Sequence, residues 1–250
     1  RSTGRVADPR RDEKVMTIRT RASKGSALTH AELDENMTDL RDGVDLRIPK
    51  TKGKGLKVDS LGTPSFPWKD IVGFMHVHDQ TDPLAPDFAT YIGGIRQYQF
   101  AVSDEAQLMF HLPHDYLPGS NIFVHAHWSH AGALVTGGTV TWGFELTFAK
   151  GHNQAAFGPT INVVEMQSAS VVPYQHMICE APASIQGGSA NLLDTDVLET
   201  DGLLFGRIYL VQNNITVSGG GVPQPFAHTV DIHYQSTGVG TKSRAPDFWT

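Results

Sequence analysis

The feature that most constrains the fold is a strict alternation over residues 140–148. The even-numbered positions carry Val, Trp, Phe, Leu and Phe, and the odd-numbered ones carry only Thr, Gly and Glu. Because side chains alternate between the two faces of a strand, this pattern predicts one large apolar face and one polar face. A strand buried on one face only is typical of an antiparallel sheet. Residues 230–234 repeat the pattern with Asp231 and His233 on the polar face.

More strands of the same kind are expected along the chain. The candidates span 71–78, 91–102, 107–112, 121–128, 161–172 and 203–211. Turn-forming residues lie between them, at 115–119, 137–138, 187–188 and 219–221, in a chain with 25 Gly and 14 Pro. Eight or more short strands with such turns predict an all-β fold, an antiparallel β-sandwich of jelly-roll type. No βαβ alternation and no phosphate-binding glycine loop appear, which argues against nucleotide-dependent chemistry.

Charge divides the chain into two pieces. Residues 1–60 contain 14 Lys and Arg against 10 Asp and Glu, a net charge of +4, and residues 61–250 contain 6 against 16, a net charge of −10. Every Trp, Tyr and Phe lies in the second piece, so only that piece can bury a sizeable core. We therefore expect an N-terminal arm (1–48), a linker rich in Lys, Gly and Ser (49–65) and a β-sandwich (66–250). The positive charges of the arm are interleaved with acids, so nucleic acid is not the expected partner.

One helix is signalled in the arm, over residues 29–41. Thr29 can cap it and Glu32 can reach back to the cap, while Leu28 and Leu33 occupy the positions of a hydrophobic staple. A narrow apolar stripe follows, and a helix this short is marginal in isolation. We expect it to dock either on its own domain or on a partner surface. The residues of this expected docking helix are Leu28, Thr29, Glu32, Leu33, Met37 and Leu40.

Two pairs of histidines mark the most reactive part of the sequence. His76 and His78 form one H-x-H pair and His125 and His127 form another, both inside predicted strands. Period two places the two imidazoles of a pair on one face, where they can share a metal ion. Three alternatives stay open: hydrogen bonding across the sandwich or in an intersubunit seam, one ion shared by three chains on a trimer axis, and a metal site within one chain. His111, His114 and His130 lie close by in the sequence.

The second pair carries a partial resemblance to cupins. Gly119, five residues and then His125-Ala-His127 resemble the opening of the cupin metal motif, which implies a cupin-like metal-dependent enzyme as the alternative function. The Glu that a cupin supplies after the pair is replaced by Ala131 and Gly132. No Gly-x-Ser-x-Gly nucleophile motif occurs, and Cys179 lies in an apolar stretch typical of a core residue. We therefore expect no enzymatic activity and no resident cofactor beyond the shared ion just described.

Two longer segments resemble structural proteins of tailed bacteriophages. Residues 24–40 (KGSALTHAELDENMTDL) resemble the K-G-S-P-L-T-H-x-E-x-D-x-N-F-x-x-L segment near the start of many phage fibre and virion proteins, with Ala27 for Pro and Met37 for Phe. Residues 110–128 (FHLPHDYLPGSNIFVHAHW) are similar to an F-x-I-P-H-x-Y-x-x-G-[ST]-x-[IL]-x-x-H-x-H-W module of uncharacterised phage structural proteins, and Trp142-Gly-Phe-Glu follows it. Little of the sequence between residues 150 and 250 is covered by either match.

The resemblance implies a role in a virion. It implies a tail-fibre or head-decoration protein of a phage or phage-like particle, with the docking helix as its particle-anchoring segment on the capsid, portal, neck or tail. It also implies a displayed β-sandwich, commonly trimeric, at the virion surface. A single Cys and the lack of an apolar leader agree with assembly in the host bacterial cytoplasm. The longest apolar runs are far shorter than 18 residues, so no membrane insertion is expected.

Attachment to a host surface would need a ligand-binding face. Aromatic side chains can stack on sugar rings. The candidates for a glycan-binding surface are Tyr91, Tyr98, Tyr116 and Trp128, and Trp142 is a further candidate. Most large aromatics in such strands belong to the core instead. A carbohydrate-binding module with no particle role is a third alternative, and it leaves the basic arm without a purpose.

Overall fold

The computed structural model describes Thr29, residues 57–58 and residues 64–248. The chain divides into two units, Arg1–Lys57 and Val58–Thr250. The helix expected over 29–41 lies outside the described residues except for Thr29, which is exposed. Throughout the described residues the chain forms strands, turns and loops without a helix, so the prediction of an all-β fold is confirmed. Accordingly, no described helix is long and apolar enough to cross a membrane.

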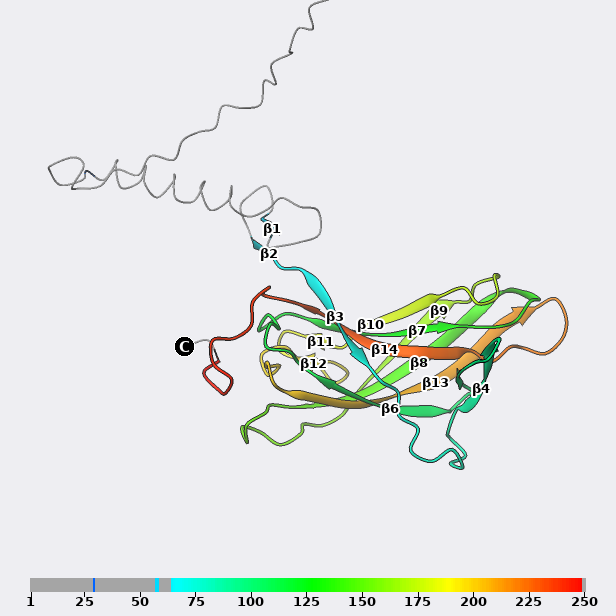
Figure 1. Ribbon diagram of the computed structural model, residues 1–250, viewed down its shortest axis with the longest axis horizontal. Helices are drawn as coiled ribbons and strands as arrows, with labels where there is room; N and C mark the ends of the chain where they lie inside the picture. Colours follow the sequence, from blue (N-terminus) through cyan, green and yellow to red (C-terminus); the bar gives the residue numbers. More distant parts are fainter. Residues whose placement is uncertain (1–28, 30–56, 59–63, 249–250) are drawn as a thin grey trace, which may run out of the picture. The chain divides into compact units, whose positions relative to one another are not determined.

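Two large antiparallel sheets make up the second unit (Figure 1). The six-stranded sheet has the order β10 (Met177–Pro182), β7 (Ile122–Ser129), β14 (Phe226–Gln235), β5 (Ile95–Gln99), β4 (Asp87–Ile92), and β3 (Trp68–Gly73) also pairs with β14. The four-stranded sheet has the order β6 (Glu105–His111), β13 (Leu203–Val217), β8 (Val135–Ala149), β9 (Ile161–Ser168). Two small pairs complete the inventory of strands: β1 (Lys57–Val58) with β2 (Pro64–Ser65), and the parallel pair β11 (Ser184–Ile185) with β12 (Leu193–Asp194).

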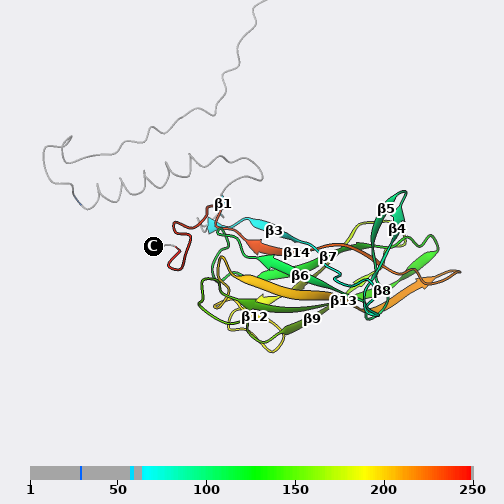
Figure 2. The same ribbon diagram turned by 60° about the horizontal axis from the view of Figure 1, so that its bottom comes forward.

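One hydrophobic cluster contains the inward side chains of both sheets, which Figure 2 shows as two layers. The even-numbered residues of 140–148 are all buried, as their alternation predicts. On β7 the inward residues are Ile122, Val124, Ala126 and Trp128, each with 0% of its surface exposed. The rings of Trp128 and Trp142 meet across the layers with centroids 6.4 Å apart. Burial of these apolar faces stabilises the fold, and it directs the odd-numbered residues of β7 to the outer face.

Some predicted strand boundaries are wrong. Residues 91–102 are not one strand: β4 and β5 form a hairpin there, with Gly93 at a φ of +57° in its turn. Strand β3 ends at Gly73 instead of continuing to His78, so the first H-x-H pair lies beyond the strand and only His76 forms an isolated bridge, to Gln107. Gly73 ends the strand against the ring of Phe110, where an added Cβ would lie 2.3 Å from a ring carbon.

The turn expected at 137–138 is a further correction. Both glycines lie inside β8, opposite an irregularity in its pairing with β13. Gly138 has a φ of +95°, and a Cβ there would lie 2.1 Å from the carbonyl oxygen of Asn214. The two glycines therefore permit a kinked, closely packed strand where the sequence suggested a chain reversal.

The connection from β6 to β7 fixes the start of β7. Tyr116 is fully buried and donates its hydroxyl hydrogen to the carbonyl oxygen of Ser120 at 2.6 Å. Asp115 accepts hydrogen bonds from the hydroxyls of Tyr234 and Ser236, which belong to the end of β14 and the residue after it. Gly119 has a φ of +78°, a backbone conformation that favours glycine. These contacts set the register in which β7 meets β14.

Candidate functional site

Polar side chains gather on the outer face of the six-stranded sheet. On β7 the outward residues include His125 and His127. Strand pairing places Asp231 of β14 and Glu180 of β10 directly beside His125, one on each side. One step along the sheet, His233 of β14 pairs with Asp70 of β3. The antiparallel register thus brings imidazoles and carboxylates from four strands onto one surface.

Three of these side chains converge on one point. The Nε2 atoms of His125 and His127 are 3.1 Å apart. The Oδ2 atom of Asp231 lies 3.2 Å from Nε2 of His127 and 3.8 Å from Nε2 of His125. Thr229 donates its hydroxyl hydrogen to the other carboxylate oxygen, Oδ1 of Asp231, at 2.8 Å. On the far side of His127, Nδ1 lies 2.6 Å from Nε2 of His176. Two imidazoles and one carboxylate therefore face each other, with outer partners that fix two of the three.

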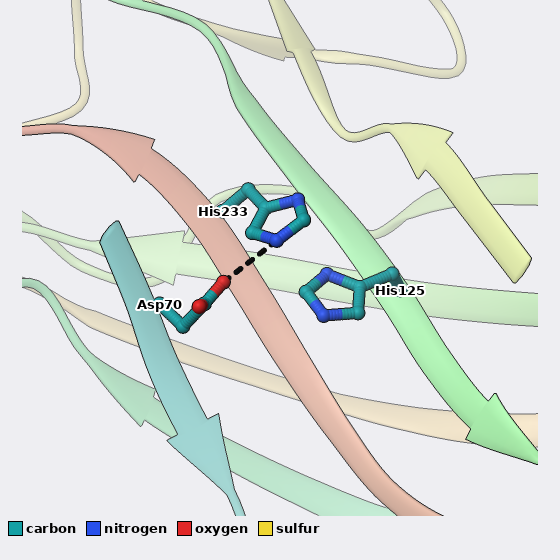
Figure 3. A group of neighbouring side chains, drawn as sticks. All are labelled: Asp70, His125 and His233. Atoms are coloured by element: carbon teal, nitrogen blue, oxygen red, sulfur yellow. Dashed lines mark ion pairs between the residues drawn. The ribbon is translucent and has the colours of Figure 1, made fainter. Parts of the chain in front are cut away.

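A second group adjoins this one and shares His125. Nε2 of His233 pairs with Oδ1 of Asp70 at 2.7 Å, and its Nδ1 contacts a carboxylate oxygen of Glu180. Figure 3 shows Asp70, His233 and His125 on three adjacent strands, with the ring of His125 beside that of His233. The centroids of these two rings are 4.0 Å apart. The ligand atoms of Asp70, His125 and His233 lie within 4.8 Å of one another, as do those of His125, His127 and Asp231.

Burial decides the protonation of these rings. Only 1% of the His125 side chain is exposed, against 18% for His127 and 8% for Asp231. Burial, reinforced by the neighbouring His233 and His127, lowers the pKa of His125 to about 4. Burial also lowers the pKa of His127, although Asp231 opposes the effect. Both rings are therefore neutral at pH 7, the state in which imidazole binds metals.

A separate hydrogen-bonded chain lies farther along the same face. The hydroxyl of Tyr91 is 2.7 Å from Oγ of Ser129, which is 2.9 Å from Nε2 of His228. Ser129 has no exposed surface, and burial lowers the pKa of His228 to about 4. This geometry orients a buried hydroxyl but offers a substrate no access to it, so we assign it a structural role.

The remaining histidines named from the sequence lie elsewhere. His76 and His78 are exposed, and neither belongs to a metal-capable group among the described residues. His111 contacts Asp201 at 2.7 Å, and His114 contacts the hydroxyl of Thr241 at 2.6 Å. The ring of His130 hydrogen-bonds the carbonyl oxygen of Ser170 at 2.7 Å. Of the two H-x-H pairs, the structure thus brings only the second into a cluster.

The glycan-stacking candidates are corrected by burial. Tyr116, Trp128 and Trp142 have no exposed surface, because all three fill the core between the sheets. Tyr91 is half-buried and contacts the rings of Tyr174, Phe226 and His228. Tyr98 is half-buried against Phe88. The three core rings therefore offer no face to a sugar, and Tyr91 and Tyr98 are each packed against at least one other ring.

One set of predicted residues lies outside the described structure, and one set of observed site residues was not predicted. The particle-anchoring residues lie outside the described part of the chain, apart from Thr29. Conversely, the cluster contains residues that the sequence analysis did not single out as ligands: Asp70, His176, Glu180, Asp231 and His233. The alternation over 230–234 already placed Asp231 and His233 on one face, so a D-x-H signal was present. No local signal joins Asp70, His176 or Glu180 to the site, since only strand pairing brings them near.

Comparison with known proteins gives no family for the chain. No protein-family model matches it, and no curated protein matches it. Among solved structures, it is similar to the CBM22-1–GH10 modules of the Clostridium thermocellum xylanase 10B complexed with xylohexaose, at 11% identity and a TM-score of 0.29. That match covers 66% of this chain and spans 25% of the xylanase chain.

Two further solved structures give similar values. Eiger TNF from S. frugiperda matches at 11% identity and a TM-score of 0.24, over 72% of this chain and 98% of that one. TmCBM61 in complex with β-1,4-galactotriose matches at 11% identity and a TM-score of 0.23, over 68% of this chain and 89% of that one. At these scores we draw no functional argument from the three likenesses.

Proposed function

We propose that this chain is a structural protein of a tailed phage or phage-like particle, a fibre or head-decoration protein that displays a β-sandwich of jelly-roll type. The observation that carries the proposal is the strand order. Leaving out the small pair β11–β12, each strand from β5 to β14 lies in the opposite sheet to the strand before it, except that β8 and β9 share a sheet. The resulting strand orders are β10-β7-β14-β5 in one sheet and β6-β13-β8-β9 in the other. This order is that of a jelly roll, an architecture common in viral capsid domains and shared with lectins and cupins.

The phage-like module supports the same proposal from the sequence. Its pattern residues Tyr116, Gly119 and Trp128 have structural roles in this fold: two fill the core, and Gly119 adopts the turn conformation before β7. The resemblance therefore concerns residues on which the jelly roll depends. The alternatives with this architecture, a cupin-like enzyme or a free-standing carbohydrate-binding module, leave the arm and its phage-like segment without a purpose. We propose accordingly that the chain is not an enzyme.

A homotrimer is part of the proposal. The outer face of the four-stranded sheet exposes Met109, Val164 and Met166, and Phe157 stacks on the partly exposed Phe205 with centroids 4.8 Å apart. Apolar surface of this kind favours association between copies. Mass measurement of the full chain by light scattering tests this part. A monomer at micromolar concentration would contradict it.

Anchoring by the arm is tested in assembled particles. We expect a chain lacking residues 1–48 to fold but to be absent from purified particles, whereas the full chain is present. A sharper variant is Leu33→Asp with Met37→Asp, which places charge on the expected apolar stripe. Thr38→Asp is the matched control, since it lies off that stripe. Normal incorporation of the truncated chain or of the double variant would contradict anchoring, and with it the virion role.

Host attachment is the remaining part of the proposal. One exposed aromatic surface that adjoins a predicted candidate is the β4–β5 hairpin, where Phe88 packs on Tyr98 and Cζ of Arg96 lies 4.9 Å from the Phe88 ring centroid. A ring paired with a guanidinium can contact a sugar by stacking and hydrogen bonding. We expect Phe88→Ala to reduce binding of the full chain to host surface glycans on an array. Equal binding by both chains would exclude this hairpin.

A further inference from the structure

We propose that His125, His127 and Asp231 form a binding site for one divalent transition-metal ion within a single chain. The proposal does not depend on the virion role. It rests on three atoms of the described chain, the two Nε2 atoms and Oδ2 of Asp231, which lie 3.1, 3.2 and 3.8 Å apart. Two imidazoles and one carboxylate on one side of a metal are a recurring ligand set for Zn²⁺ and Fe²⁺.

The placement of protons gives the first argument. Nδ1 of His127 lies 2.6 Å from Nε2 of His176, so one of these two nitrogens donates a hydrogen bond to the other. Where His127 is the donor, its Nε2 presents a lone pair 3.2 Å from Oδ2 of Asp231, and an ion between them would bind both atoms. In the other tautomer Nε2–H of His127 donates to Asp231 and no ion is needed, so metal titration distinguishes the two arrangements.

The second argument is the unsatisfied side of His125. Its side chain is 1% exposed, and its Nδ1 has no hydrogen-bond partner within the described part of the chain. The polar contacts of this ring are thus concentrated on Nε2, the atom aimed at His127 and Asp231. A buried imidazole with one unused nitrogen is costly to the fold unless another interaction compensates. Coordination of an ion through Nε2 would offset this cost, although Nδ1 would keep its unpartnered N–H.

The distances fit an ion without large rearrangement. Ligand atoms about 2.1 Å from one ion, at angles between those of octahedral and tetrahedral geometry, are roughly 3.0–3.4 Å apart. Two of the three observed distances fall in this range, and the third is longer by about 0.4 Å. The hydrogen bond from Thr229 to Oδ1 holds the Asp231 carboxylate so that Oδ2 faces the rings. The site is therefore largely preformed, with outer partners in place for His127 and Asp231.

The same geometry favours one ion per chain over an ion shared on a trimer axis. An axial ion needs imidazoles that project from the surface toward other copies, but His125 is buried. His127, with 18% of its side chain exposed, gives solvent a path to the three atoms. Three protein ligands leave at least one coordination position for water. Imidazole with carboxylate selects Zn²⁺, Fe²⁺, Co²⁺ or Ni²⁺ over Ca²⁺ and Mg²⁺.

The test is metal binding by the full chain after stripping with a chelator. We expect Zn²⁺ titrated calorimetrically to bind with a stoichiometry of one per chain, and Co²⁺ to give visible absorption bands of low-symmetry coordination. Asp231→Asn and His127→Gln preserve side-chain size and should weaken Zn²⁺ binding by more than about 100-fold, because each removes a ligand. His176→Ala removes only an outer partner and should weaken it by about 10-fold. His111→Gln, beside Asp201, is the matched control and should bind like the original chain.

Three outcomes would overturn the inference. They are no binding of Zn²⁺ or Co²⁺ by the stripped chain, a stoichiometry of one ion per three chains, and unchanged affinity in both Asp231→Asn and His127→Gln. Far-UV circular dichroism of each variant without metal separates a lost site from a lost fold. If one ligand variant fails to fold, the other still decides, since the two ligands lie on different strands.

Discussion

Replacing Asp115 by Ala tests how strongly the β6–β7 connection stabilises the fold. The Asp115 carboxylate accepts a hydrogen bond from the hydroxyl of Tyr234 at 2.9 Å and from that of Ser236 at 2.6 Å, and it pairs with Lys69. Tyr234 is 4% exposed and Ser236 is 0% exposed. The substitution therefore leaves two buried hydroxyls without their acceptor, at the point where the β6–β7 connection meets the end of β14.

The magnitude follows from these partners. A buried polar group deprived of its partner costs about 1–3 kcal/mol, so two cost about 2–6 kcal/mol. Lys69 is nearly half exposed, and its ion pair contributes less than about 1 kcal/mol. Ser236 keeps one contact, because its hydroxyl oxygen still accepts a hydrogen bond from the amide of Gly238 at 2.9 Å. We therefore expect the free energy of unfolding to fall by about 3–5 kcal/mol at pH 7.

Urea unfolding followed by tryptophan fluorescence measures this change, since the buried Trp128 and Trp142 become exposed. The control is Asp196→Ala at an exposed aspartate, which should change the free energy of unfolding by less than about 0.5 kcal/mol. A cost below about 1 kcal/mol for Asp115→Ala would refute the reasoning. It would mean that water replaces the carboxylate at no cost.

The same variant has a pH signature. Burial, the largest single influence, raises the pKa of Asp115, but hydrogen bonds from Lys69, Ser236 and Tyr234 and the charge of Lys69 together outweigh it and lower the pKa. A carboxyl whose pKa is lower in the folded state stabilises the fold above the unfolded pKa, which is about 3.9. That stability is lost as the pH falls through the folded value. The difference between the original chain and Asp115→Ala should therefore shrink from pH 5 to pH 2.5, and a constant difference would contradict this assignment.

Three other predictions follow from burial and backbone geometry. Burial raises the pKa of the Cys179 thiol to about 12, so we expect no alkylation by iodoacetamide at pH 8 in the folded chain and full alkylation in urea, measured by mass spectrometry; rapid alkylation of the folded chain would contradict this. Gly138→Ala should lower the free energy of unfolding by about 2–4 kcal/mol, because the new Cβ would sit at a strained φ and clash with the backbone of β13. Gly94→Ala, where a Cβ meets open space, should leave the free energy of unfolding nearly unchanged. Equal effects of the two substitutions in urea unfolding would refute the distinction. Met166→Glu should dissociate the proposed trimer in sedimentation experiments while the exposed-loop control Asn191→Glu leaves it intact, and an intact trimer in both would remove this face from the interface.

Much of the fold follows from the sequence because period-two patterns are local. The strands with large apolar residues at alternate positions, such as 140–148 and 230–234, are observed with the expected face buried. Strand β10 lay outside the candidate strands, since it is short and has charged or small residues at half its positions. The hairpin at 93–94 was read as continuous strand because apolar residues flank the two glycines on both sides. For β10 the deciding interaction is pairing with the distant β7, which no local pattern reports, whereas the two glycines of the hairpin are a local turn signal that was passed over.

In the candidate site, too, local patterns were readable from the sequence and contacts between distant strands were not. His125 and His127 were recognisable because their spacing places both on one face of a strand. Asp231 was on the polar face of its own predicted strand, but its pairing opposite His125 depends on the register between β7 and β14. The prediction that His76 and His78 lie inside a strand was wrong for a related reason: β3 ends at Gly73, so the two residues do not share a sheet face. Burial also separated Tyr116 and Trp128 from a binding surface, and composition alone does not distinguish a core ring from an exposed one.

Residues 110–128 contribute both to the core of the fold and to the proposed metal site. Tyr116 and Trp128 of the pattern fill the core, and Gly119 adopts the backbone conformation that starts β7. His125 and His127 have no such role, because they lie on the outer face and contribute nothing to the cluster between the sheets. His125 is buried with no partner for its Nδ1, which lowers the stability of the fold unless another interaction compensates. The proposed ion would supply that interaction, so a stripped, metal-free chain should unfold at a lower temperature than the zinc-loaded one, and equal unfolding temperatures would contradict the proposed site.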